Sequence, residues 1–257
     1  MQTEMRASYC LGLLLVCALV GGCSRKPTCR GEPEQEELYR MQQQVNDGTE
    51  PCPEHLKPKI VLDASGLHLN GERVLRQEGL KVGTHTRISP LFDRLKQNRE
   101  VWKMLHPGES FDASPTLELA GDADASVGGS VVTTTAFSGY PNQHLVVGGI
   151  AMDLRYDVPG PPHPDAPPRV ELRLERTAAG YQARYVQGSV VLAGTDAAQS
   201  FTTVPRWATA HCPTSQGACA DALALQSSGP FSAAVALLKN VLDAFPPAKR
   251  PRGVKFF

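Results

Sequence analysis

The sequence predicts an α+β fold of two small domains, each a β-hairpin followed by a βαβ unit, with helices packed on one face of a mixed sheet. Apolar residues make up 41% of the 257-residue chain and charged residues 20%, which suits a folded protein and not a disordered one. Strand-like and helix-like apolar periodicities alternate along the chain. Residues 158–168 include six prolines, and such a stiff, extended run is typical of a linker between domains.

Residues 1–22 have the layout of a secretion signal. Arg6 precedes an apolar run, Tyr9 to Val20, that is shorter than the ~20 residues a membrane-spanning helix needs. The run ends in Val-Gly-Gly-Cys23, which resembles the lipobox of bacterial lipoproteins. The resemblance implies cleavage before Cys23, acylation of that residue and attachment to a membrane through lipid. Alternatives are an uncleaved anchor, or a plain signal peptide with an incidental cysteine. Ser24 favours the periplasmic face of the outer membrane in the usual bacterial sorting pattern.

The cysteine content supports export. Of seven cysteines, two lie in the signal and Cys23 carries lipid, which leaves Cys29, Cys52, Cys212 and Cys219. An even number in an oxidising compartment predicts disulfides, and short sequence separations favour Cys29–Cys52 and Cys212–Cys219 among the three connectivities. A zinc site around His211 and Cys212 fits less well, because the spacing to Cys219 is unlike that of zinc ligands.

The first half of the mature chain begins with a polar tether, residues 23–57. Leu38, Met41 and Val45 recur at helical spacing there and predict one short helix. We expect the first domain over residues 58–157, whose elements are a strand pair or small meander within 59–75, a helix over 89–106, a strand over 116–120, a helix over 126–137 and a strand over 144–148.

The second domain is expected over residues 169–257, after the linker 158–168. Its elements are strands over 169–174, 181–192 and 222–225, a helix over 230–245 and a closing strand over 253–257. Both halves end in a short apolar strand, an intervening helix and another short apolar strand: 117–119 and 145–147 in one, 223–225 and 254–256 in the other. This pattern predicts a degenerate internal repeat.

Two stretches carry a family resemblance. KIVLDASGLHLNGERVL (59–75) resembles the opening strands of the periplasmic domain of the ExbD/TolR biopolymer-transport family, and LELAGDADASVGGSVVTTTAFSGYPNQHLVV (117–147) is similar to its second half. The resemblance covers residues 58–150, with a degenerate second copy over 169–257. It implies a periplasmic docking domain whose sheet edges can self-associate. The family's transmembrane helix bears an Asp used in proton flow. The segment from Tyr9 to Cys23 has no acidic residue, so we expect no proton-coupling role.

Few residues suggest chemistry. Asp122 and Asp124 are candidate ligands for a divalent metal, but a lone Asp-x-Asp after a strand more often starts a helix, which is the reading we favour. Gly128-Gly129-Ser130 lacks the flanking strand and the Lys of a phosphate-binding loop, which argues against phosphate binding. We expect its glycines to allow close packing instead. The seven histidines show no HxxxH or HExxH spacing, and Trp102 is expected in the core.

These features favour a non-catalytic envelope lipoprotein that binds an envelope protein or peptidoglycan and can self-associate, with no cofactor. The neutral balance of 26 basic and 26 acidic residues argues against a nucleic-acid partner. The alternative is a secreted hydrolase or metal-dependent enzyme with an unrecognised site. No nucleophile, base and oxyanion-binding group stand out together, so we expect no enzyme activity.

Overall fold

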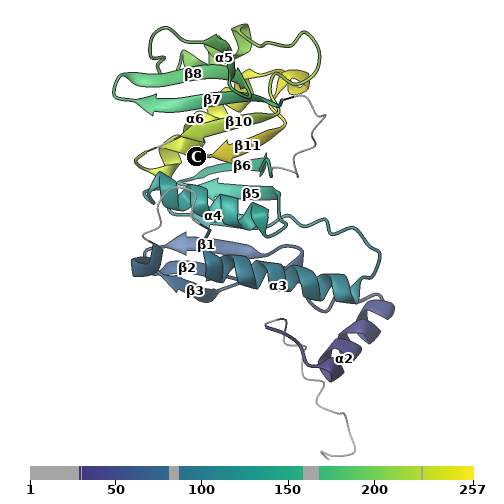
Figure 1. Cartoon of the computed structure of the whole chain (residues 1–257). Coiled ribbons are helices and arrows are strands. Elements are labelled where there is room, and N and C mark those ends of the chain that lie inside the picture. Colours follow the sequence, from purple (N-terminus) through teal and green to yellow (C-terminus); the bar gives the residue numbers. More distant parts are fainter. Residues whose placement is uncertain (1–28, 30, 81–86, 159–167, 227) are drawn as a thin grey trace, which may run out of the picture. The chain divides into compact units, whose positions relative to one another are not determined.

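The computed structural model describes residues 29, 31–80, 87–158, 168–226 and 228–257 (Figure 1). By its internal contacts the chain forms two units, Met1–Pro51 and Cys52–Phe257. The first contains the predicted short helix, α2 (Gln35–Asn46). Residues 52–57, which the sequence predicts as part of the tether, belong with the larger unit. There the Tyr140 hydroxyl donates to the carbonyl oxygen of His55 at 3.1 Å. No helix among the described residues is long and apolar enough to span a bilayer.

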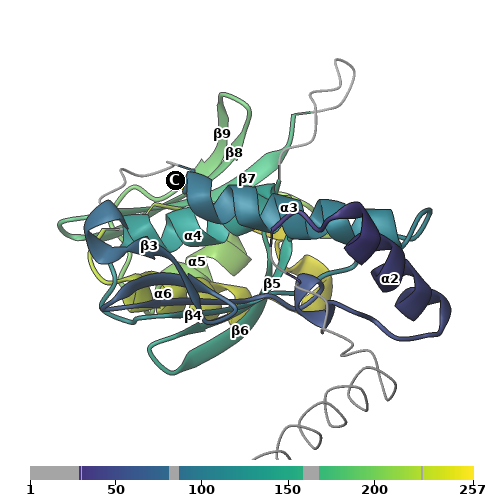
Figure 2. The same ribbon diagram turned by 90° about the horizontal axis from the view of Figure 1, so that it is seen from below.

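The larger unit begins with a six-stranded sheet in the order β3-β2-β1-β4-β5-β6. Its strands are β1 (Lys59–Asp63), β2 (Gly66–Leu69), β3 (Glu72–Arg76), β4 (Thr116–Leu119), β5 (Asn142–Val147) and β6 (Ile150–Arg155). Helices α3 (Ser89–Leu105) and α4 (Ala125–Phe137) cover one face of this sheet (Figures 1 and 2). Two short 3-10 helices, η1 (Pro53–His55) and η2 (Gln77–Leu80), flank β1 to β3 in sequence.

A five-stranded sheet follows, in the order β11-β10-β7-β8-β9. Its strands are β7 (Val170–Thr177), β8 (Gly180–Gln187), β9 (Val190–Gly194), β10 (Ala222–Gln226) and β11 (Gly253–Phe256). Helices α5 (Val204–Ala210) and α6 (Phe231–Ala244) pack against each other, and η3 (Pro247–Lys249) precedes the last strand. The α+β class with two mixed sheets is therefore confirmed.

The second half has the same topology as the first. In one sheet β1 lies between antiparallel β2 and parallel β4, and β5 is parallel to β4. In the other β7 lies between antiparallel β8 and parallel β10, and β11 is parallel to β10. The order of helices also matches, because α3 and α5 precede the closing βαβ unit and α4 and α6 lie within it. We call residues 59–155 the first repeat and 170–256 the second; β6 has no counterpart in the second.

Several elements differ from the prediction. The strand pair or meander expected within 59–75 is a three-stranded meander, and the single strand expected over 181–192 is split into β8 and β9. The split occurs at Gly188, whose φ of +60° permits a tight turn. Both β6 and the short α5 were missed. The seven residues of α5 give too few turns for a clear helical period.

The two repeats meet through equivalent loops. Asp124 precedes α4, Pro230 precedes α6, and these two residues form an antiparallel bridge. The N–H of Ala125 donates to Gly229 O at 2.8 Å, and the N–H of Phe231 donates to Ala123 O at 2.7 Å. Each helix thus donates its first N–H to the loop before the other helix, which gives the junction approximate two-fold symmetry.

Side-chain packing closes the same junction. A Cβ on Gly128 of α4 would lie 2.3 Å from Cγ of Phe231, and a Cβ on Gly129 would lie 3.1 Å from Cβ of Phe256. The expectation that these glycines allow close packing is confirmed. One continuous hydrophobic core runs through both repeats, so they form a single compact unit. Most of the predicted linker, residues 159–167, lies outside the described residues.

A second shared feature is a tryptophan–histidine stack at the end of each first helix. Trp102 stacks on His106 at the end of α3, with ring centroids 4.5 Å apart, and Trp207 stacks on His211 at the end of α5, 4.7 Å apart. These are the chain's two tryptophans. Both pairs read Trp-x-x-x-His in the sequence, and this shared spacing is a further signal of the internal repeat.

The disulfides support the cysteine prediction. Cys212 and Cys219 are joined directly after α5, as expected. Cys29 and Cys52 are each disulfide-bonded as well. Cys23, the predicted lipidation residue, lies outside the described part of the chain.

Candidate functional site

A cavity of about 680 Å³ opens at one end of the first repeat. It is bounded by the end of β1, by η2 and by the turn from β4 into α4. Its lining residues are Leu62, Asp63, Ala64, Gln77, Glu78, Leu80, Ala120, Asp122, Ala123, Asp124, Ser126 and Val127. Two of them, Asp122 and Asp124, are the pair that the sequence suggests as metal ligands or a helix start.

The strand order explains why a cavity forms here. From β1 the chain turns to β2 on one side, whereas from β4 it crosses through α4 to β5 on the other side. The connections leave neighbouring parallel strands in opposite directions, so a crevice remains outside their carboxyl ends. Ligands of open α/β sheets bind in crevices of this kind.

The cavity is acidic. Four of its lining residues carry carboxylates: Asp63, Glu78, Asp122 and Asp124. The described residues that line it include no Lys, Arg or His. The hydroxyl and the backbone N–H of Ser65 both donate to Asp63, each at 2.7 Å, and these hydrogen bonds lower the pKa of that carboxyl. Asp63 is therefore charged at neutral pH, and the lining as a whole favours a cationic group.

The Asp-x-Asp pair divides into two roles. Asp124 is the N-cap of α4 and accepts the N–H of Ser126 at 2.8 Å, which confirms the helix-start interpretation. Asp122 lines the cavity. Across the described residues, no group of three or more His, Cys, Asp or Glu side chains could hold a metal ion. The metal-ligand interpretation of the pair therefore receives no support.

One Ser, His and Asp do meet beside the cavity, in the β1–β2 turn. Ser65 Oγ lies 2.8 Å from Nε2 of His68 and donates to Asp63. The hydroxyl has one proton. If that proton goes to Asp63, then Nε2 must donate to Ser65 Oγ and cannot act as its base. Asp63 also lies near the same nitrogen, at 3.6 Å, whereas in a catalytic triad the acid orients the other nitrogen. These contacts stabilise a turn.

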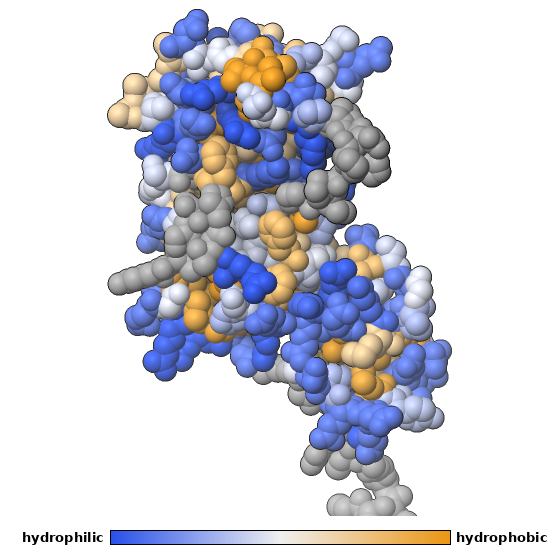
Figure 3. Space-filling model, viewed as in Figure 1, coloured by the Kyte–Doolittle hydropathy of each residue, from blue (hydrophilic) through white to orange (hydrophobic). Residues whose placement is uncertain are grey.

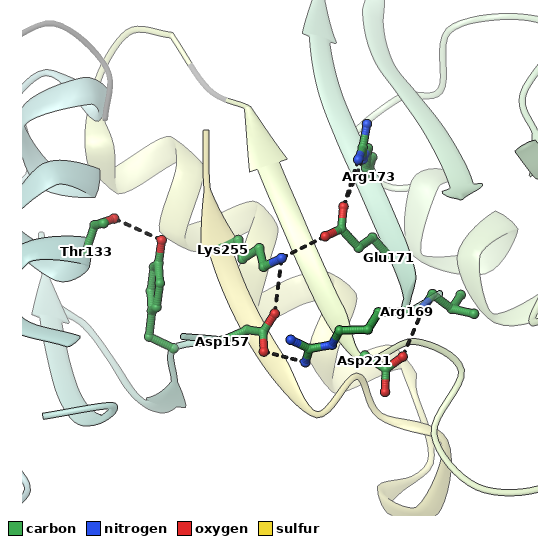
Figure 4. Close-up of polar contacts among 9 residues, drawn as sticks. Thr133, Asp157, Arg169, Glu171, Arg173, Asp221 and Lys255 are labelled. Atoms are coloured by element: carbon green, nitrogen blue, oxygen red, sulfur yellow. Dashed lines mark hydrogen bonds and ion pairs between the residues drawn. The ribbon is translucent and has the colours of Figure 1, made fainter. Parts of the chain in front are cut away.

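A second polar cluster lies at the junction of the repeats (Figure 4). The Lys255 ammonium of β11 sits between two carboxylates, 2.7 Å from Glu171 Oε1 and 3.2 Å from Asp157 Oδ2. Arg173 donates to Glu171 at 3.0 Å, and Arg169 donates to Asp157. Asp157 follows β6, the last strand of the first repeat, and its N–H donates to Val254 O at 2.8 Å. The cluster therefore ties β6 to the second sheet.

Electrostatics at the junction favour the charged forms. Burial works against ionisation of Glu171, but hydrogen bonds and charge from Lys255 and Arg173 outweigh it and lower the pKa of this carboxyl. Burial likewise opposes the charge of Lys255, but Glu171 and Asp157 outweigh it and raise the pKa of the ammonium. A lysine held protonated in this way is a poor nucleophile, so the cluster is structural.

A scan of family models and searches of curated proteins and solved structures found no match to this chain.

Proposed function

We propose that this chain is a non-catalytic lipoprotein of the cell envelope, anchored through Cys23, whose first repeat binds a basic group of an envelope partner. The lipobox-like segment and the even number of disulfide-forming cysteines support the location. The resemblance to the periplasmic domain of the ExbD/TolR family supports a docking role. The acidic cavity supports the chemistry of the ligand: an ammonium or guanidinium group, as carried by a protein segment or by an amine of peptidoglycan.

The observation that carries the proposal is the asymmetry between the repeats. In the strand registers Leu62 of β1 pairs with Leu119 of β4, and Leu174 of β7 pairs with Leu225 of β10, so Leu62 and Leu174 are equivalent. Two residues after each of them lie Ala64, at the cavity, and Arg176, which is its counterpart in the second repeat. The Arg176 guanidinium donates to Ser228 O at 2.7 Å, across to the loop after β10. The second repeat thus supplies its own cation where the first leaves carboxylates facing a cavity.

The binding test uses the full processed protein with its anchor. Binding to isolated peptidoglycan and to extracted envelope proteins is measured for the parent, for Asp122→Asn combined with Glu78→Gln, and for the control Glu100→Gln on α3. We expect binding that weakens with salt, and a loss of about five- to tenfold per removed carboxylate in the cavity variant alone. Equal binding by the cavity variant and the control would overturn the proposal.

Two further measurements separate the anchor from the site. Mass spectrometry of the purified protein should find a chain that begins at acylated Cys23, and Cys23→Ala should leave the membrane fraction. For the enzyme alternative, turnover of an envelope substrate that is abolished by Ser65→Ala would replace the binding proposal with hydrolysis.

A further inference from the structure

The turn between β2 and β3 holds the chain's one Asn-Gly pair, Asn70-Gly71. Asparagine is a thermolabile residue, and a following glycine makes it more so, because glycine has no side chain to keep its backbone nitrogen from the asparagine side chain. The chain's other four asparagines are each followed by a larger residue. We propose that Asn70 is a site of self-modification, where the side chain cyclises with Gly71 at a rate set by opening of the β2–β3 hairpin.

The reaction needs only the chain and water. The Gly71 nitrogen bonds to Cγ of Asn70, and the side-chain nitrogen leaves as ammonia with the proton that the Gly71 N–H gives up. A five-membered succinimide ring remains. Water then opens one of the two ring bonds to the Gly71 nitrogen. Opening at Cγ gives aspartate, and opening at the backbone carbonyl gives isoaspartate, in which the main chain runs through Cγ.

The native turn holds Asn70 away from this reaction. Both turn residues have positive φ, +52° at Asn70 and +80° at Gly71, as in type I′ hairpin turns. The side-chain oxygen of Asn70 accepts the N–H of Lys59 at 2.8 Å, and the N–H of Asn70 donates to Lys59 O at 2.8 Å. These bonds hold the asparagine against β1. Its side chain must leave Lys59 before it can turn toward the Gly71 nitrogen.

Opening of the hairpin is enough to permit the reaction. Space is available, because a Cβ on Gly71 would meet no atom within 4 Å. β3 is an edge strand with β2 on one side, and an ion pair between Glu72 and Arg94 ties it to α3. Segments with few partners open locally at a small part of the free energy of global unfolding. The rate of modification therefore reports how often β3 detaches.

The second repeat cannot react in this way. Its equivalent turn, between β8 and β9, is Gly188-Ser189, with a φ of +60° at Gly188 and no asparagine. The strand that follows, β9, has three exposed apolar residues, 190–192, and no charged residue, whereas β3 has one acidic and two basic residues. The face of the molecule in Figure 3 is mostly hydrophilic, with small separated apolar groups. The modification thus changes the first repeat alone.

The two products should affect the fold differently. Aspartate keeps an oxygen that can accept the N–H of Lys59 and tolerates positive φ, so the turn survives. Isoaspartate adds a methylene to the main chain within a two-residue turn, which disturbs the register of β3 on β2. β3 leads directly into η2, which carries Glu78 and Leu80 of the cavity wall. The proposal depends on the geometry of the turn and not on the proposed function.

Peptide mapping by mass spectrometry tests the site. The full processed protein is aged at mildly alkaline pH beside a synthetic peptide of residues 66–76. We expect aspartate and isoaspartate at position 70, formed at least about tenfold more slowly than in the peptide, and no comparable change at Asn142. Equal rates in protein and peptide, or a protein in which Asn70 stays intact, would overturn the proposal.

Loosening of β3 tests the control by the hairpin. Arg94→Ala removes the ion pair to Glu72 and should raise the rate at Asn70 about threefold without changing the circular dichroism spectrum. Glu72→Gln should act in the same direction. The matched control, Arg206→Ala on exposed α5 surface, should leave the rate unchanged. If Arg94→Ala and Glu72→Gln both react at the parent rate, opening of this hairpin does not govern the reaction and the proposal fails.

Trypsin distinguishes the two products. It cuts after Arg73 and Arg76 only when β3 leaves the sheet. The isoaspartate fraction of aged protein should be cut there faster than the fresh parent, and Asn70→Asp should be cut at the parent rate. Equal cutting of all three would contradict the expected loss of register.

Discussion

Apart from β6, the two repeats share their strand order, and they share their tryptophan–histidine stacks, but they differ at the ends of their strands and at their outer sheet edges. The first repeat leaves an acidic cavity at the ends of its strands and protects its edge with charge. The second spans the equivalent strand ends with Arg176, adds a disulfide after α5 and leaves its edge apolar. The junction is also uneven, because α4 has Gly128 and Gly129 where α6, aligned by its first residue, has Ala234 and Val235. The same framework thus carries different features in the two repeats: a cavity lined by carboxylates in the first, and an arginine and a disulfide in the second.

The largest expected effect comes from the small residues of α4. Gly128→Ala places a methyl group where the Phe231 ring lies, 2.3 Å from its Cγ, in a core that has no room to move. Alanine favours a helix by about 1 kcal/mol over glycine, yet we expect a net loss of roughly 3 kcal/mol in the free energy of unfolding. Urea denaturation followed by circular dichroism measures it.

Two controls make that result specific. Gly194→Ala, whose new Cβ would lie 3.6 Å from Arg184 Cγ, should change stability by less than about 0.5 kcal/mol. Phe231→Ala removes the clashing ring, so the double variant should cost less than the sum of the two single changes. Additive losses would show that α4 and α6 do not share this contact.

The next effect is confined to the second repeat. Replacing Cys212 and Cys219 with serine removes a short cross-link, which the loop-entropy relation values at about 2.5 kcal/mol. The first repeat has no disulfide after α3, so the comparison can be made within one molecule. Trp102→Phe and Trp207→Phe leave one fluorescent reporter in the second or the first repeat, respectively. Because the repeats share one core, both reporters should lose stability together. Unfolding seen by Trp207 alone would mean that the repeats are separate domains.

Much of this framework is predictable from the sequence, for physical reasons that can be stated. The apolar residues of α6 lie on one face, so its helical period can be read directly. The helix α4 is buried almost all round, and its ends are predicted from the turn residues that flank it. Asp124 was recognised as a helix start because N-caps depend on local chemistry. The cavity was not predicted, because Asp63, Glu78 and Asp122 lie apart in sequence and only the strand order brings them together. The pairing of the loops at Asp124 and Pro230 is likewise a property of tertiary structure.

A smaller effect concerns the ionic cluster at the junction. Glu171 has a folded pKa below the usual value of 4.5, so its contribution is present above pH 4.5 and is lost as pH falls through the depressed pKa. Lys255 has a raised pKa, so its contribution is present below the usual lysine value and is lost as pH rises through the folded one. Glu171→Gln should cost about 1.5 kcal/mol at neutral pH, since its carboxylate is mostly buried and accepts charged hydrogen bonds.

The pH profile separates this role from simple packing. The difference between parent and Glu171→Gln should shrink as the pH falls below 4.5, because the unfolded carboxylate takes up its proton there and the folded one follows at its lower pKa. A difference that stays constant down to pH 3 would mean that the glutamate acts through its shape and not through its charge.

The smallest expected effects are the different losses of stability on replacing Asp122 and Asp124. Asp124→Ala removes the cap of α4 and should cost about 1 kcal/mol, whereas Asp122→Ala removes one of four carboxylates around the cavity and should change stability by less than about 0.5 kcal/mol. The same helix position in the second repeat is Pro230, which has no side-chain oxygen, so Asp124 is a feature of the first repeat alone. For partner binding we expect Asp122 to matter more than it does for stability. Asp122→Ala should weaken binding, because it removes a charge that no described side chain neutralises. Asp124→Asn keeps the cap and should lower affinity with little effect on stability. If Asp122→Ala instead destabilised the fold by more than Asp124→Ala, Asp122 would be structural, and the cavity would lose its claim to be a binding site.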